Sequence, residues 1–88
     1  MRVDFGRKFV KQLKKAPKEI RTAFVERFEL FKNDVFHPLL NNHALTGEYK
    51  GCRSFNVTGD WRVVFKEVSK DFILFAAIGT HSQLHKGN

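Results

Sequence analysis

The strongest constraint on the fold is an unbroken apolar run over residues 72–78. A strand with one exposed face alternates apolar and polar residues. A continuous run of this length is instead typical of a central strand covered on both faces. A polar turn at residues 69–71 precedes the run, and a Gly-Thr-His sequence follows it at residues 79–81. The chain must therefore build a sheet around this segment and cover it with other apolar side chains.

The first 36 residues carry the apolar pattern of two helices. Phe5, Phe9 and Leu13 recur every four residues. Pro17 then separates the two patterns, because proline ends one helix and is tolerated in the first turn of the next. The second stripe consists of Ile20, Phe24, Phe28, Phe31 and Val35. The pattern predicts a helical hairpin with one apolar face, ended by His37 and Pro38.

The remaining strands are shorter. Residues 1–5 alternate as an edge strand does, and residues 49–57 and 61–68 read as two strands joined by a turn at residues 58–60. The predicted order is β-α-α-β-β-β, an α+β fold with the helical hairpin packed on a small, mainly antiparallel sheet. No linker or repeat interrupts the chain, so residues 1–88 are expected to form a single domain.

Size and charge narrow the possible functions. A chain of 88 residues buries only about 60–65% of its unfolded surface, so it needs a dense core, and its ten phenylalanines can form one. The net charge of +7 favours a polyanionic partner: nucleic acid, an acidic protein or an anionic membrane face. A lone cysteine, Cys52, and the lack of a signal or membrane-spanning segment predict a cytoplasmic protein without membrane attachment.

Part of the positive charge lies on the first predicted helix. Lys8, Lys11 and Lys15 share one side of it, away from the phenylalanines. Such a run can be an ordinary solvated face, but the overall excess of cations favours contact with phosphates, where each neutralised phosphate releases counterions. A membrane-surface helix is disfavoured because Phe5 and Phe9 are needed in the core.

Several groups that can carry chemistry fall at the ends of the predicted strands. They are His43, Asp60, Arg62 and His81. Two groups that move protons near neutral pH, set among cations, are what a metal-free ribonuclease needs. Such an enzyme deprotonates a ribose 2′-OH, protonates the leaving 5′-oxygen and stabilises the phosphorane between them. The structural alternatives are turn residues for His43 and Asp60 and a surface salt bridge for Arg62.

Other polar residues fit supporting roles. Arg53 flanks the same predicted hairpin, and its planar guanidinium suits phosphate better than a lysine does. Asn56 lies on the strand that leads to the turn. No Cys pairs or clustered carboxylates accompany the histidines, so we expect neither a metal nor another cofactor. Cys52 lacks the signature of an activated thiol and is expected to be structural.

Three blocks in order resemble a known family. They are residues 43–53 (HALTGEYKGCR), residues 57–65 (VTGDWRVVF) and residues 79–84 (GTHSQL). Together these blocks resemble the RelE/ParE toxin superfamily, and within it the RelE-type mRNA interferases of the YafQ-like branch. The first 36 residues match only in helical pattern and basic character. The resemblance implies two helices against an antiparallel sheet, in agreement with the pattern above.

The resemblance also implies a function. It implies the cytoplasmic toxin of a type II toxin–antitoxin system, which enters the ribosomal A site, cuts mRNA there and is held inactive by an acidic antitoxin. By position, His81 matches the general acid and Asp60 the general base. His43 matches a histidine that steadies the scissile phosphate, and Arg62 an arginine that is catalytically important in the RelE branch.

Two positions depart from the YafQ-like pattern. Asn56 stands where that branch has a histidine, and His85 where it has an aromatic residue. An amide can orient a substrate but cannot titrate, and losing the aromatic ring changes base stacking. These departures leave two alternatives: a slower nuclease, or a different division of the work among His43, His81 and His85.

The leading hypothesis is a ribosome-dependent endoribonuclease that leaves a 2′,3′-cyclic phosphate. The alternatives are a ParE-like toxin that inhibits DNA gyrase and a degenerate toxin that only binds its antitoxin. Alone, the chain is expected to be monomeric, and it is expected to form a higher oligomer with the antitoxin. The residues expected to contact RNA are Arg53, Lys50, Trp61, Asn56, His85, Lys8, Lys11 and Lys15.

Overall fold

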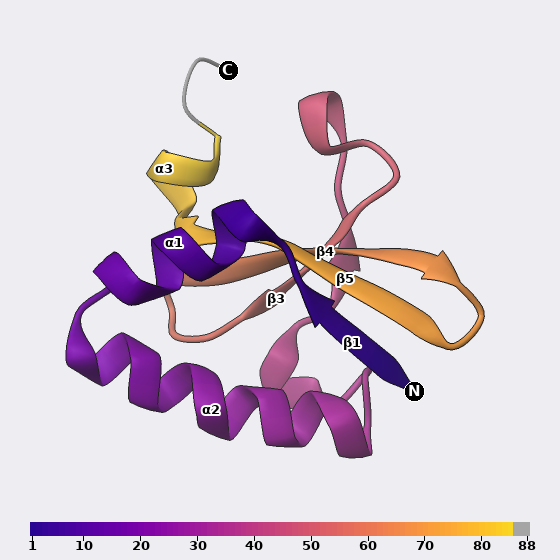
Figure 1. Cartoon of the computed structure of the whole chain (residues 1–88), viewed down its shortest axis with the longest axis horizontal. Coiled ribbons are helices and arrows are strands. Elements are labelled where there is room, and N and C mark those ends of the chain that lie inside the picture. Colours follow the sequence, from indigo (N-terminus) through magenta and orange to yellow (C-terminus); the bar gives the residue numbers. More distant parts are fainter. Residues whose placement is uncertain (86–88) are drawn as a thin grey trace.

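The computed structural model describes residues 1–85 and has the predicted α+β architecture (Figure 1). A five-stranded sheet carries two long helices, and a short third helix follows the last strand. The elements are β1 (Arg2–Phe5), α1 (Arg7–Lys15), α2 (Lys18–Asn33), β2 (His43–Ala44), β3 (Arg53–Asn56), β4 (Trp61–Ser69), β5 (Phe72–Thr80) and α3 (His81–Leu84), with single 3-10 turns at Pro38–Leu40 and Gly47–Tyr49. Within residues 1–85, none of the helices has the length and apolarity needed to cross a membrane.

The sheet order is β1-β5-β4-β3-β2. The apolar run predicted as a central strand is β5, which lies between β1 and β4. The edge strand predicted over residues 1–5 is β1, with Val3 paired in parallel to Ile73. All other neighbouring strands are antiparallel. The expectation of a mainly antiparallel sheet is therefore confirmed.

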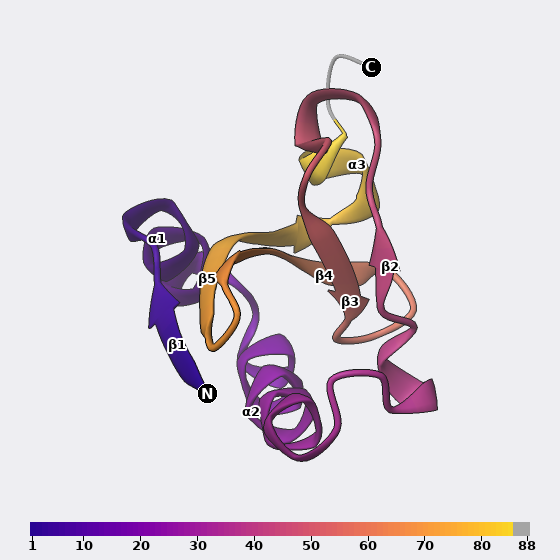
Figure 2. The same cartoon turned by 90° about the vertical axis from the view of Figure 1, so that its right-hand side faces the viewer.

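Helices α1 and α2 contribute to one aromatic core on the same face of the sheet. Figure 2 shows α2 on one side of the strands and α3 on the other. Phe75 of β5 is the centre of this core and is fully buried. The centroid of its ring lies between 5.5 and 6.2 Å from those of Phe5, Phe9, Phe24, Phe28, Phe31, Phe55 and Phe65. The apolar stripes that predict the helical hairpin are the side chains that meet here.

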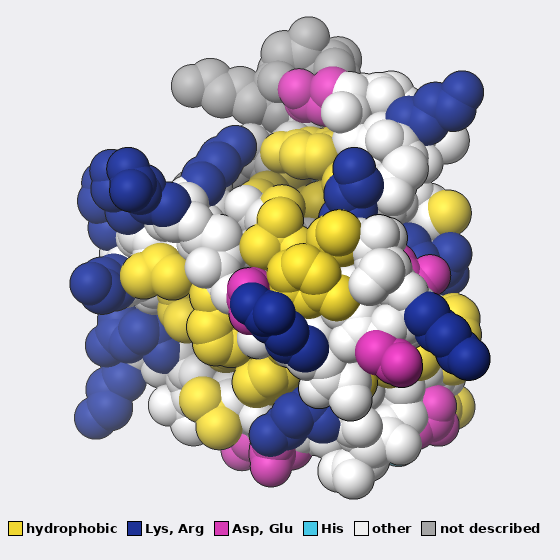
Figure 3. Space-filling view, turned by 45° about the vertical axis from the view of Figure 1, so that its right-hand side comes forward, with side chains coloured by type: hydrophobic (Ala, Val, Ile, Leu, Met, Phe, Trp, Pro, Cys, Tyr) yellow, Lys and Arg dark blue, Asp and Glu magenta, His cyan; other side chains and the backbone are white. Residues whose placement is uncertain are grey.

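The opposite face of the sheet has a smaller core. Val64, Ala77 and Leu84 are buried there, with Leu45 and Tyr49 packed against them. Near the other end of β5, side chains such as Leu74 are only partly covered. The prediction that this strand is covered on both faces is thus confirmed only for its C-terminal half. Figure 3 shows apolar side chains reaching the surface of one face and Lys and Arg crowded along the left margin of that view.

The strand predicted over residues 49–57 is wrong at its start. Gly47–Tyr49 is a 3-10 turn, and β3 begins only at Arg53. Gly47 and Gly51 have φ values of 70° and 93°, which break the extended conformation and favour glycine. The turn folds the chain back, so that the short strand β2, absent from the prediction, pairs with β3.

Helix α3 was also not predicted, although the sequence carries its start signal. Thr80 and Gln83 form a capping box: Gln83 N–H donates to Thr80 Oγ1 over 3.1 Å, and Thr80 N–H donates to Gln83 Oε1 over 2.9 Å. Leu84 anchors the helix in the smaller core. Gly79 lies beneath it, and a Cβ atom there would come within 3.1 Å of Gln83 Oε1. This short helix fixes the position of His81, its first residue.

Candidate active site

A hollow of about 440 Å³ lies on the sheet face opposite α1 and α2. Its chemically active lining consists of His43 from β2, Arg62 from β4, and His81 and His85 from α3 and its C-cap. We call it the histidine hollow. Residues 44–47 complete its lining. The structure thus brings together residues that lie far apart in the sequence.

Strand register explains this convergence. On β2, His43 pairs with Ser54 of β3. On β4, Arg62 pairs with Asn56 of β3 on one side and with Gly79 of β5 on the other. Helix α3 begins two residues after Gly79. Paired residues on neighbouring strands point to the same face of a sheet. Trp61 precedes Arg62 and packs on the opposite face of the sheet, against the aromatic core, as the predicted alternation of the two residues requires.

Arg62 and His81 are hydrogen-bonded, with 2.9 Å between Arg62 Nη1 and His81 Nδ1. A guanidinium group has only donors, so Nδ1 of His81 is the acceptor in this contact. The neutral imidazole then carries its hydrogen on Nε2. His81 is therefore held as a group that presents a hydrogen rather than a lone pair at Nε2.

His43 is held in the opposite tautomer. Its Nδ1 lies 2.8 Å from the carbonyl oxygen of Asn41, which can only accept. In the neutral ring the hydrogen is therefore on Nδ1, and the lone pair is on Nε2. Asn41 adopts a left-handed conformation with φ of 48°, and this geometry is part of the turn that leads into β2. The histidine hollow thus contains one proton acceptor and one hydrogen donor.

His85 packs beside His81, with ring centroids 4.6 Å apart. It also meets the ring of Tyr49 edge-on, at 6.0 Å between centroids. Its backbone N–H closes α3 by donating to the carbonyl of His81. These contacts make His85 part of the hollow and not a detached surface residue.

The phenol of Tyr49 gives a prediction for alkaline pH. Burial raises the pKa of Tyr49 above its ordinary value of 10.0, and the Glu48 carboxylate raises it further. A group whose pKa is raised by folding favours the folded state below its unfolded pKa, and this contribution is lost as pH rises through the raised value. We expect the free energy of unfolding to fall above about pH 10 for this reason.

Tyr49 is the only tyrosine, so its ionisation can be followed directly by absorbance. The phenolate should appear at higher pH in the native protein than in denaturant. Equal midpoints in the two states would contradict the raised pKa. A Tyr49→Phe variant, which lacks the titrating group, serves as the control for stability.

Asp60 is beside His81 but is not part of the hollow's lining. The backbone carbonyl of Asp60 accepts a hydrogen bond from His81 N–H over 3.0 Å, which ties the turn before β4 to the start of α3. The carboxylate is exposed, and within residues 1–85 it makes no hydrogen bond or ion pair. The structure therefore brings Asp60 and His81 together through the backbone.

Unpaired polar atoms lie on the same sheet face. Ser54 Oγ, Asn56 Oδ1 and Arg62 Nε are buried without a hydrogen-bond partner among residues 1–85. Each such atom costs about 1–3 kcal/mol unless water or a ligand pairs with it. Ser54 is 2% exposed and was missed by the sequence analysis. Ser54 and Asn56 are two residues apart on one strand, and this spacing was the available signal that Ser54 lies on the same sheet face as Asn56.

Other predicted RNA contacts lie elsewhere. Arg53 is on the helix face, where its Nε donates to Asn42 Oδ1 over 2.7 Å and its guanidinium lies 5.5 Å from the centre of the Phe36 ring. Lys50 is exposed after the 3-10 turn that borders the hollow. The helix lysines are exposed along α1: Lys8, Lys11 and Lys15.

Within residues 1–85 no group of three or more His, Cys, Asp or Glu side chains is arranged to hold a metal ion. Cys52 is a half-buried free thiol that packs against the smaller core. This position fits the structural role expected for it.

Solved structures resemble this fold closely. YafQ from Escherichia coli strain BL21(DE3) superposes with a TM-score of 0.80 at 23% identity, covering 97% of this chain and 99% of that one. YafQ in the E. coli DinJ–YafQ toxin–antitoxin complex gives 0.76 at 24% identity, with 94% of both chains covered. The RelB–RelE antitoxin–toxin complex from Methanococcus jannaschii gives 0.71 at 23% identity, with 91% and 92% covered. At these identities the likeness establishes the fold.

The sequence itself identifies the family. No curated protein sequence matches the chain significantly. A family model described as the bacterial toxin of type II toxin–antitoxin systems, YafQ, matches residues 1–86. This match spans all three sequence blocks and both helices. The chain therefore belongs to the YafQ family of type II bacterial toxins.

Proposed function

We propose that this chain is a metal-free endoribonuclease that cuts mRNA on the ribosome and thereby inhibits translation. The observation that carries the proposal is the pair of opposite tautomers in the histidine hollow. His43 presents a lone pair at Nε2, and His81 presents a hydrogen at Nε2, with Arg62 bonded to His81. A base, an acid and a cation are the groups that transfer of a 2′-oxygen to phosphorus requires.

In the proposed reaction, His43 takes the proton of the ribose 2′-OH. The 2′-oxygen attacks the adjacent phosphorus, and Arg62 stabilises the charge of the phosphorane. The bond from phosphorus to the 5′-oxygen then breaks while His81 gives that oxygen a proton. The products are a 2′,3′-cyclic phosphate and a fragment with a free 5′-OH, and no metal or other cofactor takes part.

Arg62 can couple phosphate binding to the acid. In the free protein its guanidinium occupies Nδ1 of His81. A phosphate is the stronger, charge-assisted partner for an arginine, so its arrival draws the guanidinium away. Nδ1 can then take up a proton, which converts His81 to the imidazolium, a far better acid than the neutral ring.

The geometry of the hollow and the family resemblance suggest different residues for the general base. The resemblance gives this role to Asp60, whereas the lining of the hollow favours His43. We expect His43→Ala to slow cleavage by at least about 100-fold, the lower end for general acid–base catalysis. Asp60→Asn, which keeps the backbone contact to His81, should change the rate only a few-fold.

The comparison is made by primer extension on a message translated by purified ribosomes. A large loss in Asp60→Asn with little loss in His43→Ala would return the role of base to Asp60. Losses in neither variant would contradict the whole proposal. Thermal unfolding of both variants checks that each remains folded.

The ribosome and the exposed lysines have separate roles in this proposal. The ribosomal A site holds the message bent for in-line attack, and this orientation accelerates the reaction. The net charge of +7 and the exposed α1 lysines provide affinity for phosphates without sequence preference. A supercoiling assay with DNA gyrase tests the alternative of a ParE-like toxin.

We also propose that an acidic antitoxin binds this chain and holds it inactive in the cytoplasm. The relatives solved with DinJ and RelB as toxin–antitoxin complexes support this partner. The basic surface complements an acidic chain, since opposite charges speed association. On its own the toxin is expected to be monomeric, with a higher oligomer formed on antitoxin binding. Light scattering with and without the antitoxin tests both states.

A further inference from the structure

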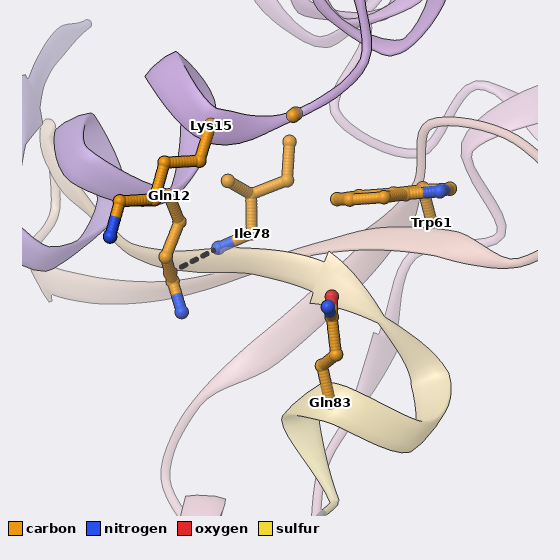
Figure 4. A pocket seen from close by; sticks show the side chains of 6 residues that line it. Gln12, Lys15, Trp61, Ile78 and Gln83 are labelled. Carbon is orange, nitrogen blue, oxygen red and sulfur yellow. Dashed lines mark hydrogen bonds between the residues drawn. The ribbon is translucent and has the colours of Figure 1, made fainter.

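We propose that a second pocket binds a nucleobase of the message, with a preference for guanine. This proposal rests on the nuclease function proposed above. The pocket lies between the end of α1, the start of β4 and α3, and has a volume of about 350 Å³, within the usual range for small-molecule sites. We call it the indole pocket, and its lining is Gln12, Lys15, Ala16, Trp61, Ile78 and Gln83 (Figure 4).

Trp61 provides a flat platform at a fixed position. Its backbone N–H donates to Thr58 Oγ1 over 3.1 Å, and its carbonyl accepts from the backbone of residues 57 and 58. The Trp61 ring is half-buried against the aromatic core. Figure 4 shows the indole edge-on, with the Gln83 side chain reaching up from α3 on one side of the ring plane. Stacking of a base on such a ring contributes about 1–3 kcal/mol.

Two glutamine side chains offer free hydrogen-bond donors in the pocket lining. Gln12 Oε1 accepts from Ile78 N–H over 2.9 Å, and Gln83 Oε1 accepts from Thr80 N–H over 2.9 Å. A backbone N–H needs an acceptor, so each amide is held with its oxygen on the backbone and its Nε2 directed away from it. Within residues 1–85 neither Nε2 makes a hydrogen bond. Lys15 adds a third donor, and no carboxylate lines the pocket.

A ligand for this pocket must therefore be flat and rich in acceptors. Guanine presents two neighbouring acceptors, O6 and N7, on one edge. Adenine replaces the first of these with a donor, N6–H₂, which would oppose a glutamine Nε2. The fixed amide orientation thus favours guanine over adenine. Lys15 can pair with the phosphate of the same nucleotide.

The position of the pocket connects it to the cleavage site. His81 of α3 and His85 at its C-cap line the histidine hollow, whereas Gln83 of α3 lines the indole pocket. A helix is about 10 Å across, so the two sites are separated by the width of α3. An RNA strand that crosses α3 can place its scissile phosphate in the histidine hollow and a neighbouring base on Trp61. The indole pocket would then select the base beside the cut.

The chain permits a direct test because Trp61 is its only tryptophan. Full-length protein carrying His81→Ala, which prevents cleavage, is titrated with guanosine or adenosine 5′-monophosphate while tryptophan fluorescence is recorded. A parallel titration of N-acetyltryptophanamide corrects for absorption by the nucleotide. We expect saturable quenching, with guanosine monophosphate binding about 10-fold more tightly, a difference equal to ~1.4 kcal/mol.

A matched pair of additional substitutions tests the donor argument. Gln12→Glu keeps an acceptor for Ile78 N–H but removes the free donor, and should weaken guanosine monophosphate binding by at least about 10-fold. Lys14→Gln is the control, because it changes the net charge by the same amount from a residue of α1 outside the pocket lining. It should bind as the parent protein does. Circular dichroism verifies that both variants are folded.

Absence of saturable quenching, or equal binding by the Gln12→Glu and Lys14→Gln proteins, would overturn the proposal. Equal affinity for the two nucleotides would overturn the guanine preference. These measurements need neither ribosomes nor chemistry. If the His81→Ala protein shows quenching but the parent protein, with His81 intact, does not cut mRNA on ribosomes, the nuclease function alone is refuted. If the parent protein cuts mRNA but quenching is absent, the nucleobase site alone is refuted.

Discussion

Replacing His81 with alanine is expected to slow cleavage of ribosome-bound mRNA by about 10⁴-fold, the upper end for general acid–base catalysis. The proposed reaction gives His81 two tasks: it protonates the leaving 5′-oxygen, and its Nδ1 holds Arg62 in the histidine hollow before the substrate arrives. The side chain is exposed, so its removal should change the free energy of unfolding by only about 0.5 kcal/mol or less.

The measurement is the cleavage rate of a translated message, followed by primer extension at saturating toxin. Ser82→Ala is the control, because Ser82 is the next exposed residue of α3 and does not line the histidine hollow. It should cut at the parental rate. A His81→Ala protein that cuts within a few-fold of that rate would exclude His81 from the chemistry. Growth arrest on expression of each variant provides the corresponding test in cells.

The second large effect concerns the aromatic core. Phe75→Ala is expected to lower the free energy of unfolding by about 3–5 kcal/mol, because it leaves a cavity at the centre of the core. Phe75 is fully buried and meets rings from both helices and from the neighbouring strands. The total stability of a natural domain is only about 5–15 kcal/mol, so this loss can leave a substantial unfolded population.

Urea unfolding followed by circular dichroism measures the change. Val25→Ala is a suitable control, since Val25 lies on α2 but is 60% exposed. It should unfold near the parental midpoint. A Phe75→Ala protein with a loss below about 1.5 kcal/mol would mean that the surrounding rings close the cavity by repacking. In that case Phe75 would not make the large contribution to the free energy of unfolding that its central position predicts.

The elements that the sequence predicts well are those with long apolar patterns. The stripe from Ile20 to Phe31 on α2 and the run that contains Phe75 on β5 each specify a buried face without reference to the rest of the chain. The predicted end of the second helix was wrong, because α2 ends at Asn33 and Val35 lies beyond it. Short elements depend on partners and were missed. β2 exists because two glycines with positive φ return the chain to β3, and α3 exists because Thr80 and Gln83 cap it while Leu84 is buried.

The site was predictable to a similar degree. The sequence places His43, Arg62 and His81 at strand ends, and the structure brings all three into one hollow. Arg53 was expected there, but the register of β3 turns it to the helix face, where Asn42 binds it. The tautomers of the histidines lay beyond sequence reasoning. They depend on a carbonyl of Asn41 in a left-handed turn and on which nitrogen of His81 meets Arg62.

The sheet order also determines when the toxin can become active during its own synthesis. Strand β5, which lies between β1 and β4, is made after the other four described strands, and β1 has no neighbour until β5 has left the exit tunnel. Pairings between such distant segments form slowly. A nascent chain that lacks residues 72–85 therefore has neither a closed sheet nor His81. Under the proposed function, the ribosome that makes this protein is therefore spared until β5 and α3 have been synthesised.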